Sequence, residues 1–365
     1  MFFDVRKEGQ MRARRFQITG LILGGMILTS PVLAQEKPAG KVWGYAFGDY
    51  FYKLHGTSAE VSPTQYSAVT KDFQAFQFRR LQLYYDHNLS EKFFARFMME
   101  VNDKSPMPDG KFGDFLKAAY IEWKNIIPRG NAALGLYPSP TCSWLTEKVW
   151  GYRSIEKTIT DFRGLGGSGG ATDLGIVLRG NFDAASRYGY GIMVANGTGQ
   201  KAENNKYKKF YGELFAKPMN QVVLEAYADY EPGADKNIYT CKGFAAYQTA
   251  RLTAGVEAVA QPHIIDSSGN YEKIALGMAF FVWGPVPSVE KLSAFARFDF
   301  FNPNTHNQVS GFNEYFFVAG LDYTPIKNVH FIPNLWLNAF SDKSPAKLEK
   351  DADVAARLTF YYIYE

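Results

Sequence analysis

This sequence of 365 residues contains little cysteine, no long apolar run after its N-terminal segment and only a small net charge. The only two cysteines, Cys142 and Cys241, are too few for a scaffold held by disulfides. No run after residue 34 approaches the roughly 18 apolar residues of a transmembrane helix, which excludes a helical membrane protein. The formal charge of +4 falls to about +1 once a net +3 in residues 1–34 is set aside. Bulk charge therefore indicates no nucleic acid or other anionic partner.

The N-terminal segment has the order of a secretory signal peptide. Starting at Met11, three arginines precede an apolar stretch from Ile18 to Leu28, and small residues lead to Ala34. The apolar stretch is well short of the roughly 20 residues that a retained anchor needs. We therefore predict a signal peptide over residues 1–34, cleaved after Ala34. Residues 1–10 contain acidic side chains that suit such a peptide poorly, so Met11 is the alternative natural start.

Aromatic residues and period-two patterns dominate the rest of the chain. Phe, Tyr and Trp make up 16% of the sequence, a composition that suits a protein wall crossing the two interfaces of a bilayer. Alternation of apolar and polar residues predicts strands. Sixteen are expected, at residues 42–54, 73–87, 93–101, 114–125, 131–138, 172–182, 187–196, 208–217, 221–230, 238–248, 251–260, 273–283, 291–300, 314–323, 329–339 and 353–364.

The gaps between these strands alternate between long and short. Connections after odd strands are long, whereas those after even strands are as short as "KPMN" and "TPIKN". Outer-membrane barrels have this one-sided pattern, while a soluble sandwich spaces its strands evenly at about 8–12 residues. We predict an all-β fold: a transmembrane antiparallel β-barrel of about 16 strands formed by residues 35–365, in the bacterial outer membrane.

Strand alternation also assigns side chains to lipid or to the lumen. Carboxylates are predicted in the lumen at Glu213, Glu225, Glu257, Asp299 and Asp49, and basic side chains at Arg96, Arg179, Arg297 and Arg357. Arg79 and Arg80 are adjacent, so alternation places them on opposite faces and assigns neither firmly. Two interpretations stay open for each lumen arginine: a structural ion-pair lattice, or selection of solutes by charge.

The third long connection, residues 139–171, is the longest, and a loop of this length is usually functional. We expect it to fold into the lumen and to place Arg153, Lys157 and Arg163 at the constriction. Its run "GLGGSGG" matches the spacing G-x-G-x-x-G, but a loop precedes it and a strand follows it, so a dinucleotide site is rejected. Glycines accept backbone angles closed to other residues. The predicted loop hinge consists of Gly164, Gly166, Gly167, Gly169 and Gly170.

Other chemistry has little support in the sequence. Export into an oxidising compartment allows the hypothesis that Cys142 and Cys241 form a disulfide that pins the loop, with Cys241 on the lumen face. The five histidines are scattered and accompany no Ser or Asp motif and no metal-ligand spacing. We therefore expect no catalytic residues, no metal site and no cofactor. A non-conducting structural or adhesive barrel and, least favoured, an outer-membrane barrel enzyme stay open as alternatives.

Five segments together resemble the phosphate-selective porin O/P family of outer-membrane channels: "GYAFGDYFYKL", "FRRLQLYYDHNLSEKFFARF", "WGYRSIEKTITDFRGLG", "NVHFIPNLWLN" and "ARLTFYYIY". The resemblance implies a sixteen-stranded barrel, usually a homotrimer, whose third loop narrows a water-filled pore. It further implies passive diffusion of small hydrophilic solutes, with a preference for anions or phosphate. Family members concentrate basic residues along the pore, and the matching positions are Arg96, Arg179, Arg297, Arg357, Arg153, Lys157 and Arg163.

Overall fold

A computed structural model describes residues 40–56, 66, 68–265, 271–306, 311–343 and 349–365. The predicted signal peptide, residues 1–34, lies outside the described residues. Within the described part of the chain, no helix has the length and the apolar character needed to cross a membrane.

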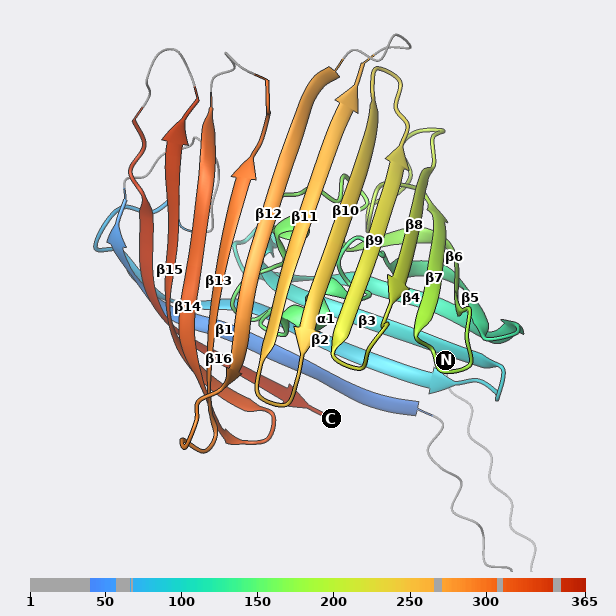
Figure 1. Ribbon diagram of the computed structural model, residues 1–365, viewed down its shortest axis with the longest axis horizontal. Coiled ribbons are helices and arrows are strands. Elements are labelled where there is room, and N and C mark those ends of the chain that lie inside the picture. The colour runs from blue at the N-terminus through green and yellow to red at the C-terminus, as the bar shows by residue number, and fades with distance from the viewer. Residues whose placement is uncertain (1–39, 57–65, 67, 266–270, 307–310, 344–348) are drawn as a thin grey trace, which may run out of the picture. The chain divides into compact units, whose positions relative to one another are not determined.

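The described chain is a closed antiparallel barrel of sixteen strands (Figure 1). Each strand pairs with its neighbours in sequence, and β1 pairs with β16 to close the barrel. All sixteen predicted strands are confirmed, with ends shifted by a few residues. Their bounds are β1 Gly40–His55, β2 Gln74–Asn88, β3 Phe93–Pro106, β4 Phe112–Ile127, β5 Gly130–Pro138, β6 Thr172–Asn181, β7 Tyr188–Ala195, β8 Lys209–Ala216, β9 Val222–Glu231, β10 Asn237–Gln248, β11 Thr253–Ile264, β12 Tyr271–Pro285, β13 Leu292–Asn302, β14 Phe312–Ile326, β15 Val329–Asp342 and β16 Asp353–Tyr364.

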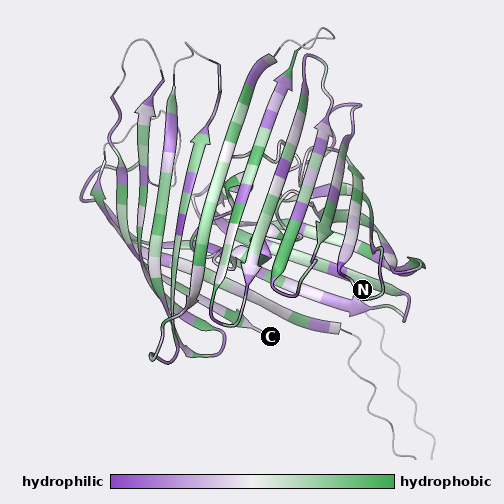
Figure 2. Cartoon of the chain, in the orientation of Figure 1, coloured by the Kyte–Doolittle hydropathy of each residue, from purple (hydrophilic) through white to green (hydrophobic). Residues whose placement is uncertain are grey.

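Side chains alternate between the two faces of the wall because successive residues of a strand point in opposite directions. On β16, Leu358 and Tyr362 are exposed on the outer face, while Arg357 and Thr359 are buried on the inner face. Hydrophobic and hydrophilic residues alternate in this way along the strands (Figure 2). Period-two sorting thus places most wall residues correctly.

Two β-bulges, one on β2 and one on β4, interrupt the alternation of side chains between the two faces. Phe47 pairs with Arg80 and Gly48 with Phe78, which leaves Arg79 as an extra residue on β2. A bulge turns adjacent side chains to the same face, and both Arg79 and Arg80 have largely buried side chains on the interior face. The prediction that they lie on opposite faces is wrong for this reason. Lys117 is the corresponding extra residue on β4, between the partners of Met98 and Met99.

The loop between β5 and β6 carries two short helices, α1 Thr146–Trp150 and α2 Ile159–Phe162. Figure 1 shows α1 inside the wall of strands. The loop contacts the interior of the barrel, since α1 touches β11 and α2 touches β12. The predicted inward fold of this loop is confirmed.

Candidate functional site

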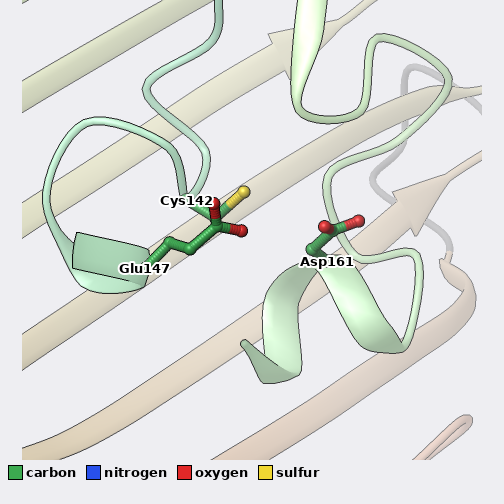
Figure 3. Close-up of side chains that lie close together, drawn as sticks. All are labelled: Cys142, Glu147 and Asp161. Atoms are coloured by element: carbon green, nitrogen blue, oxygen red, sulfur yellow. The ribbon is translucent and has the colours of Figure 1, made fainter. Parts of the chain in front are cut away.

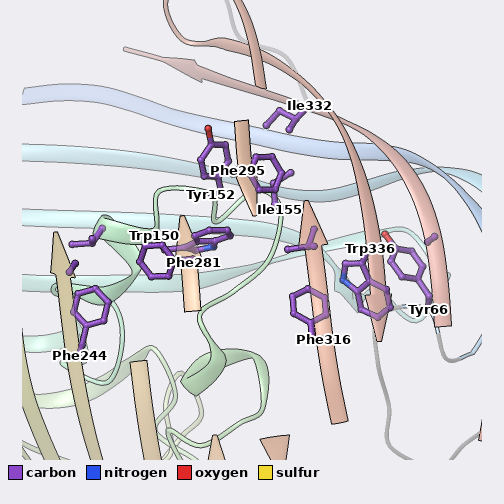
Figure 4. Packing of buried hydrophobic residues seen from close by; sticks show 14 of the residues in the cluster. Tyr66, Trp150, Tyr152, Ile155, Phe244, Phe281, Phe295, Phe316, Ile332 and Trp336 are labelled. Carbon is purple, nitrogen blue, oxygen red and sulfur yellow. The ribbon is translucent and has the colours of Figure 1, made fainter. Parts of the chain in front are cut away.

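The loop packs its apolar side chains against the inner face of one half of the barrel. Trp150 lies 5.1 Å from Phe281, and Tyr152 stacks at 4.4 Å on Phe295, both measured between ring centroids. Ile155, fully buried, belongs to the same cluster (Figure 4). Burying one large apolar side chain contributes roughly 1.5–3 kcal/mol. This cluster therefore fills the lumen on the side of β10 to β16.

Basic side chains of the wall hold the loop by its backbone. Four of them donate hydrogen bonds to loop carbonyl oxygens, which satisfies groups that would otherwise be buried without partners. The bonds are Arg79 to Ser154 (2.8 Å), Lys209 to Gly166 (2.7 Å), Lys242 to Thr141 (2.6 Å) and Arg297 to Lys157 (2.5 Å). We call these four residues the loop clamps. They come from β2, β8, β10 and β13, so the loop is fixed from several sides.

Most of the predicted lumen carboxylates form ion pairs or hydrogen bonds with the clamps and with the loop. Glu225 pairs with Lys242 at 2.8 Å and accepts a hydrogen bond from Thr146 of α1. Glu257 accepts one from Thr160 of α2. Two more carboxylates pair with arginines of the wall: Asp299 with Arg297 at 2.6 Å, and Asp49 with Arg79 at 3.4 Å. Glu213 is buried on β8. These negative charges are therefore either neutralised in place or buried.

A cavity of about 640 Å³ remains between the other side of the loop and the wall formed by β1 to β6 and β16. We call it the basic cavity, because basic side chains dominate its lining. Among the described residues, two acidic side chains line it, Glu147 and Asp161, against seven basic ones: Arg80, Arg96, Lys117, Lys148, Arg153, Lys157 and Arg179.

Part of this positive charge is balanced by ion pairs. Arg96 binds Asp86 through two nitrogens, at 2.6 and 2.8 Å. Glu100 lies 3.2 Å from Arg80 and 4.0 Å from Lys117. Counting these two carboxylates with the two that line the cavity still leaves three more positive than negative charges. An excess of one sign in a narrow aqueous space favours ions of the other sign.

Lys148 and Arg179 contribute positive charge that no ion pair balances. Neither forms an ion pair with any described residue. Lys148 is exposed on α1. The Arg179 guanidinium lies 3.8 Å from the centre of the Trp144 ring. Both charges therefore face the basic cavity without a carboxylate partner.

Ion pairs also tie α1 to α2 within the loop. Arg153 lies 2.9 Å from Glu147 and 3.8 Å from Asp161, and Lys157 lies 2.9 Å from Asp161. Burial alone would raise the pKa of Asp161, but Lys157 and Arg153 outweigh it and hold the pKa below its usual range. Asp161 therefore stays ionised at neutral pH, and the cluster keeps the charged face of the loop in place.

The predicted arginines and lysines divide into two groups. Arg96, Arg179, Arg153 and Lys157 line the basic cavity. Arg163, Arg297 and Arg357 are buried in packing contacts: Arg163 with Glu314 and Asn338, Arg357 with Asn334. The sequence pattern did not predict Arg80, Lys117 and Lys148 as lining residues of this cavity. The first two lie beside or at bulges, which period-two sorting does not detect, and Lys148 sits on a helix of the loop.

The glycine run returns the chain from the loop to β6. Gly164, Gly167 and Gly170 have φ values of +67°, +66° and +53°, angles that side-chain-bearing residues rarely adopt. Lys209, one of the loop clamps, binds the carbonyl oxygen of Gly166. The clamp and the left-handed turns together set where the loop leaves the lumen.

Gly164→Ala and Gly167→Ala form a matched test of this turn. Both glycines have nearly the same φ, so both substitutions add about 1–2 kcal/mol of backbone strain. A Cβ on Gly164 would meet nothing within 4 Å, whereas one on Gly167 would lie 2.2 Å from Glu231 Oε2 and 2.7 Å from Lys209 Nζ. We expect Gly167→Ala to lower the free energy of unfolding by a further 1–3 kcal/mol or so, measured by urea titration in detergent. Equal losses for the two variants would contradict this role of the clamp.

The disulfide prediction is wrong. Both cysteines are free: Cys142 is buried and Cys241 is exposed. Thr240 and Lys242 occupy the interior face of β10, so the residue between them points outward. Cys241 therefore lies on the outer face of the wall and not on the lumen face.

Cys142, Glu147 and Asp161 bring ligand-type atoms within 4.8 Å of one another in the loop (Figure 3). Arg153 and Lys157 already pair with the two carboxylates. Burial raises the pKa of the Cys142 thiol and keeps it protonated, whereas metals bind the thiolate. These residues fit an internal ion-pair cluster better than a metal site.

The barrel is similar to solved structures of outer-membrane proteins. An anion-selective porin from Comamonas acidovorans matches with a TM-score of 0.64 and 11% identity, over 89% of this chain and 99% of that one. The outer-membrane channel DcaP of Acinetobacter baumannii gives 0.62 and 13%, over 89% and 96%. OmpT, an outer membrane protein of Vibrio cholerae in its trimer form, gives 0.58 and 9%, over 89% and 99%. Identities this low establish the fold alone. No family model matches the sequence, and no curated protein matches it.

Proposed function

We propose that this protein is an outer-membrane porin whose water-filled channel lets small hydrophilic solutes diffuse passively, with a preference for anions. The basic cavity between the loop and the wall of β1 to β6 is the observation that carries the proposal. This cavity has a volume of about 640 Å³ between the inward loop and the barrel wall, and seven basic side chains line it.

The anion preference follows from where the two signs of charge lie. Carboxylates on β1, β9, β11 and β13 bind clamps or loop hydroxyls on the packed side. Basic residues face the open side, and two of them have no carboxylate partner among the described residues. Fixed charge in a narrow, poorly screened channel selects by sign. Phosphate, which the resemblance of the sequence suggests, is one anion that this lining would attract.

Location and assembly complete the proposal. A chain exported by the signal peptide of residues 1–34 would insert its apolar outer face into outer-membrane lipid. A homotrimer agrees with the family resemblance, and OmpT of Vibrio cholerae, similar in fold, has been solved in a trimer form. Lipid and small solutes would be its other partners.

Current through planar bilayers under a gradient of potassium chloride tests the function. We expect stable open channels and a reversal potential of the sign that anion selectivity produces. A reversal potential of the opposite sign would contradict the anion preference. Absence of any channel activity from correctly folded protein would instead favour a structural or adhesive barrel.

A further inference from the structure

Aromatic rings line the basic cavity together with the cations. From this combination we infer that its preferred solutes are organic anions that carry a flat ring, with aromatic carboxylates as the simplest class. The inference rests on the proposed anion channel and narrows its substrate class.

The rings form one connected surface on the interior of β1, β2 and β16. Trp43 stacks on Tyr84 with ring centroids 3.8 Å apart. Tyr45 lies 6.4 Å from Tyr84 and 5.9 Å from Tyr361. All four side chains line the cavity. We call them the ring platform.

The ring platform is only partly covered. Each of its four residues keeps intermediate exposure, although the interior position excludes lipid as the covering partner. On the opposite side of the loop, the rings of Trp150, Phe281 and Phe316 are almost completely buried within one hydrophobic cluster. The platform therefore presents apolar surface to an aqueous space. An aromatic contact contributes about 0.5–1.5 kcal/mol beyond the area it buries, which a ring-bearing solute would gain and a bare ion would not.

Two cationic side chains lie next to these rings, Arg96 paired with Asp86 and Arg80 paired with Glu100. The Arg96 guanidinium is 5.5 Å from the Trp43 ring centroid and 5.3 Å from that of Tyr84. Arg80 precedes Tyr84 by four residues on β2, a separation of about 13 Å along the strand. A solute with a carboxylate on a ring would meet cations beside the loop and apolar surface just beyond them. A small inorganic anion would use the cations alone.

Permeability ratios of organic anions in planar bilayers test the inference. Benzoate, cyclohexanecarboxylate and acetate carry the same charge, but only benzoate has a flat aromatic ring. In a plain aqueous tube the smaller acetate would permeate faster. We expect benzoate to be at least as permeant as acetate and more permeant than cyclohexanecarboxylate, and to block chloride current at lower concentration than acetate.

Two double variants distinguish the loss of platform rings from the loss of tyrosines elsewhere on the same wall. Tyr45→Leu/Tyr84→Leu removes two platform rings, and we expect the benzoate-to-acetate permeability ratio to fall about threefold, as about 0.7 kcal/mol of lost ring contact implies. The control Tyr85→Leu/Tyr362→Leu removes two tyrosines exposed on the outer face of the same wall and should leave the ratio unchanged. Chloride-over-potassium selectivity should persist in both, since no charge is altered.

The outcomes distinguish the inference from the function on which it rests. Anion-selective channels in which acetate exceeds benzoate, with equal blocking by the two, would overturn the ring preference and leave the porin proposal intact. Channels that select cations, or do not conduct, would overturn the proposed function itself. If the platform variant does not fold, the three carboxylates are compared as blockers of chloride current in the unmodified protein. Stronger block by benzoate than by the other two supports the ring preference, and equal block contradicts it.

Discussion

Replacing Lys148 and Arg179 by glutamine should lower the chloride-over-potassium permeability ratio about fivefold. In water, a unit charge about 8 Å away stabilises chloride and destabilises potassium by roughly 0.5 kcal/mol each, so two charges change the energy difference between the two ions by about 2 kcal/mol. Screening by salt at about 0.1 M roughly halves this difference to about 1 kcal/mol, which corresponds to a fivefold change. Both side chains line the basic cavity and neither makes an ion pair with a described residue, so their loss breaks no ion pair in the described part of the chain. The measurement is the reversal potential across a planar bilayer under a gradient of potassium chloride.

A control with the same change in net charge is available outside the cavity. Lys217 and Arg251 are exposed at short turns of the barrel, and Lys217→Gln/Arg251→Gln also removes two positive charges. We expect its reversal potential to match that of the unmodified protein, since charges at this distance are screened by salt. Equal shifts in both double variants would show that net charge, and not the basic cavity, sets the selectivity.

Replacing Lys242 by methionine should lower the free energy of unfolding by about 3–5 kcal/mol. Lys242 is fully buried and donates hydrogen bonds to the carbonyl oxygen of Thr141 and to the hydroxyl of Thr146, at 2.6 and 3.1 Å. Its ammonium group also balances Glu225 at 2.8 Å. Without it, a buried carboxylate loses its partner and the loop loses a clamp. We expect larger and less stable single-channel conductance along with the loss measured by urea titration in detergent.

Two further variants show whether the buried charge is responsible. Adding Glu225→Gln to Lys242→Met removes both charges, and we expect it to recover most of the stability, because a neutral buried pair avoids the desolvation cost. Lys236→Met removes the cation from the exposed pair with Glu272 and should cost no more than about 1 kcal/mol. A single variant at Lys242 as mild as the one at Lys236 would contradict the clamp.

The clamps change how the lumen arginines are interpreted. Arg297 binds Asp299 and the loop backbone, and Arg163 binds Glu314 across the barrel. For these residues the contacts favour the structural interpretation, since their guanidinium groups bind the loop backbone or tie the loop to the wall. Arg179, at the same kind of position in the pattern, faces the cavity. The distinction depends on contacts between segments as much as 175 residues apart, which no local pattern records.

The sequence by itself determined the barrel, the order of its strands, the faces of most wall residues and the inward loop. These features follow from alternation and loop length, which are local and regular. Tertiary structure alone decided which charged side chains of the interior face the basic cavity without an ion-pair partner. Bulges at Arg79 and Lys117 re-aim side chains against the alternation, because register depends on how two strands pair. The packed loop then neutralises carboxylates on one side and leaves cations and rings on the other, since burial and pairing depend on which distant residues meet.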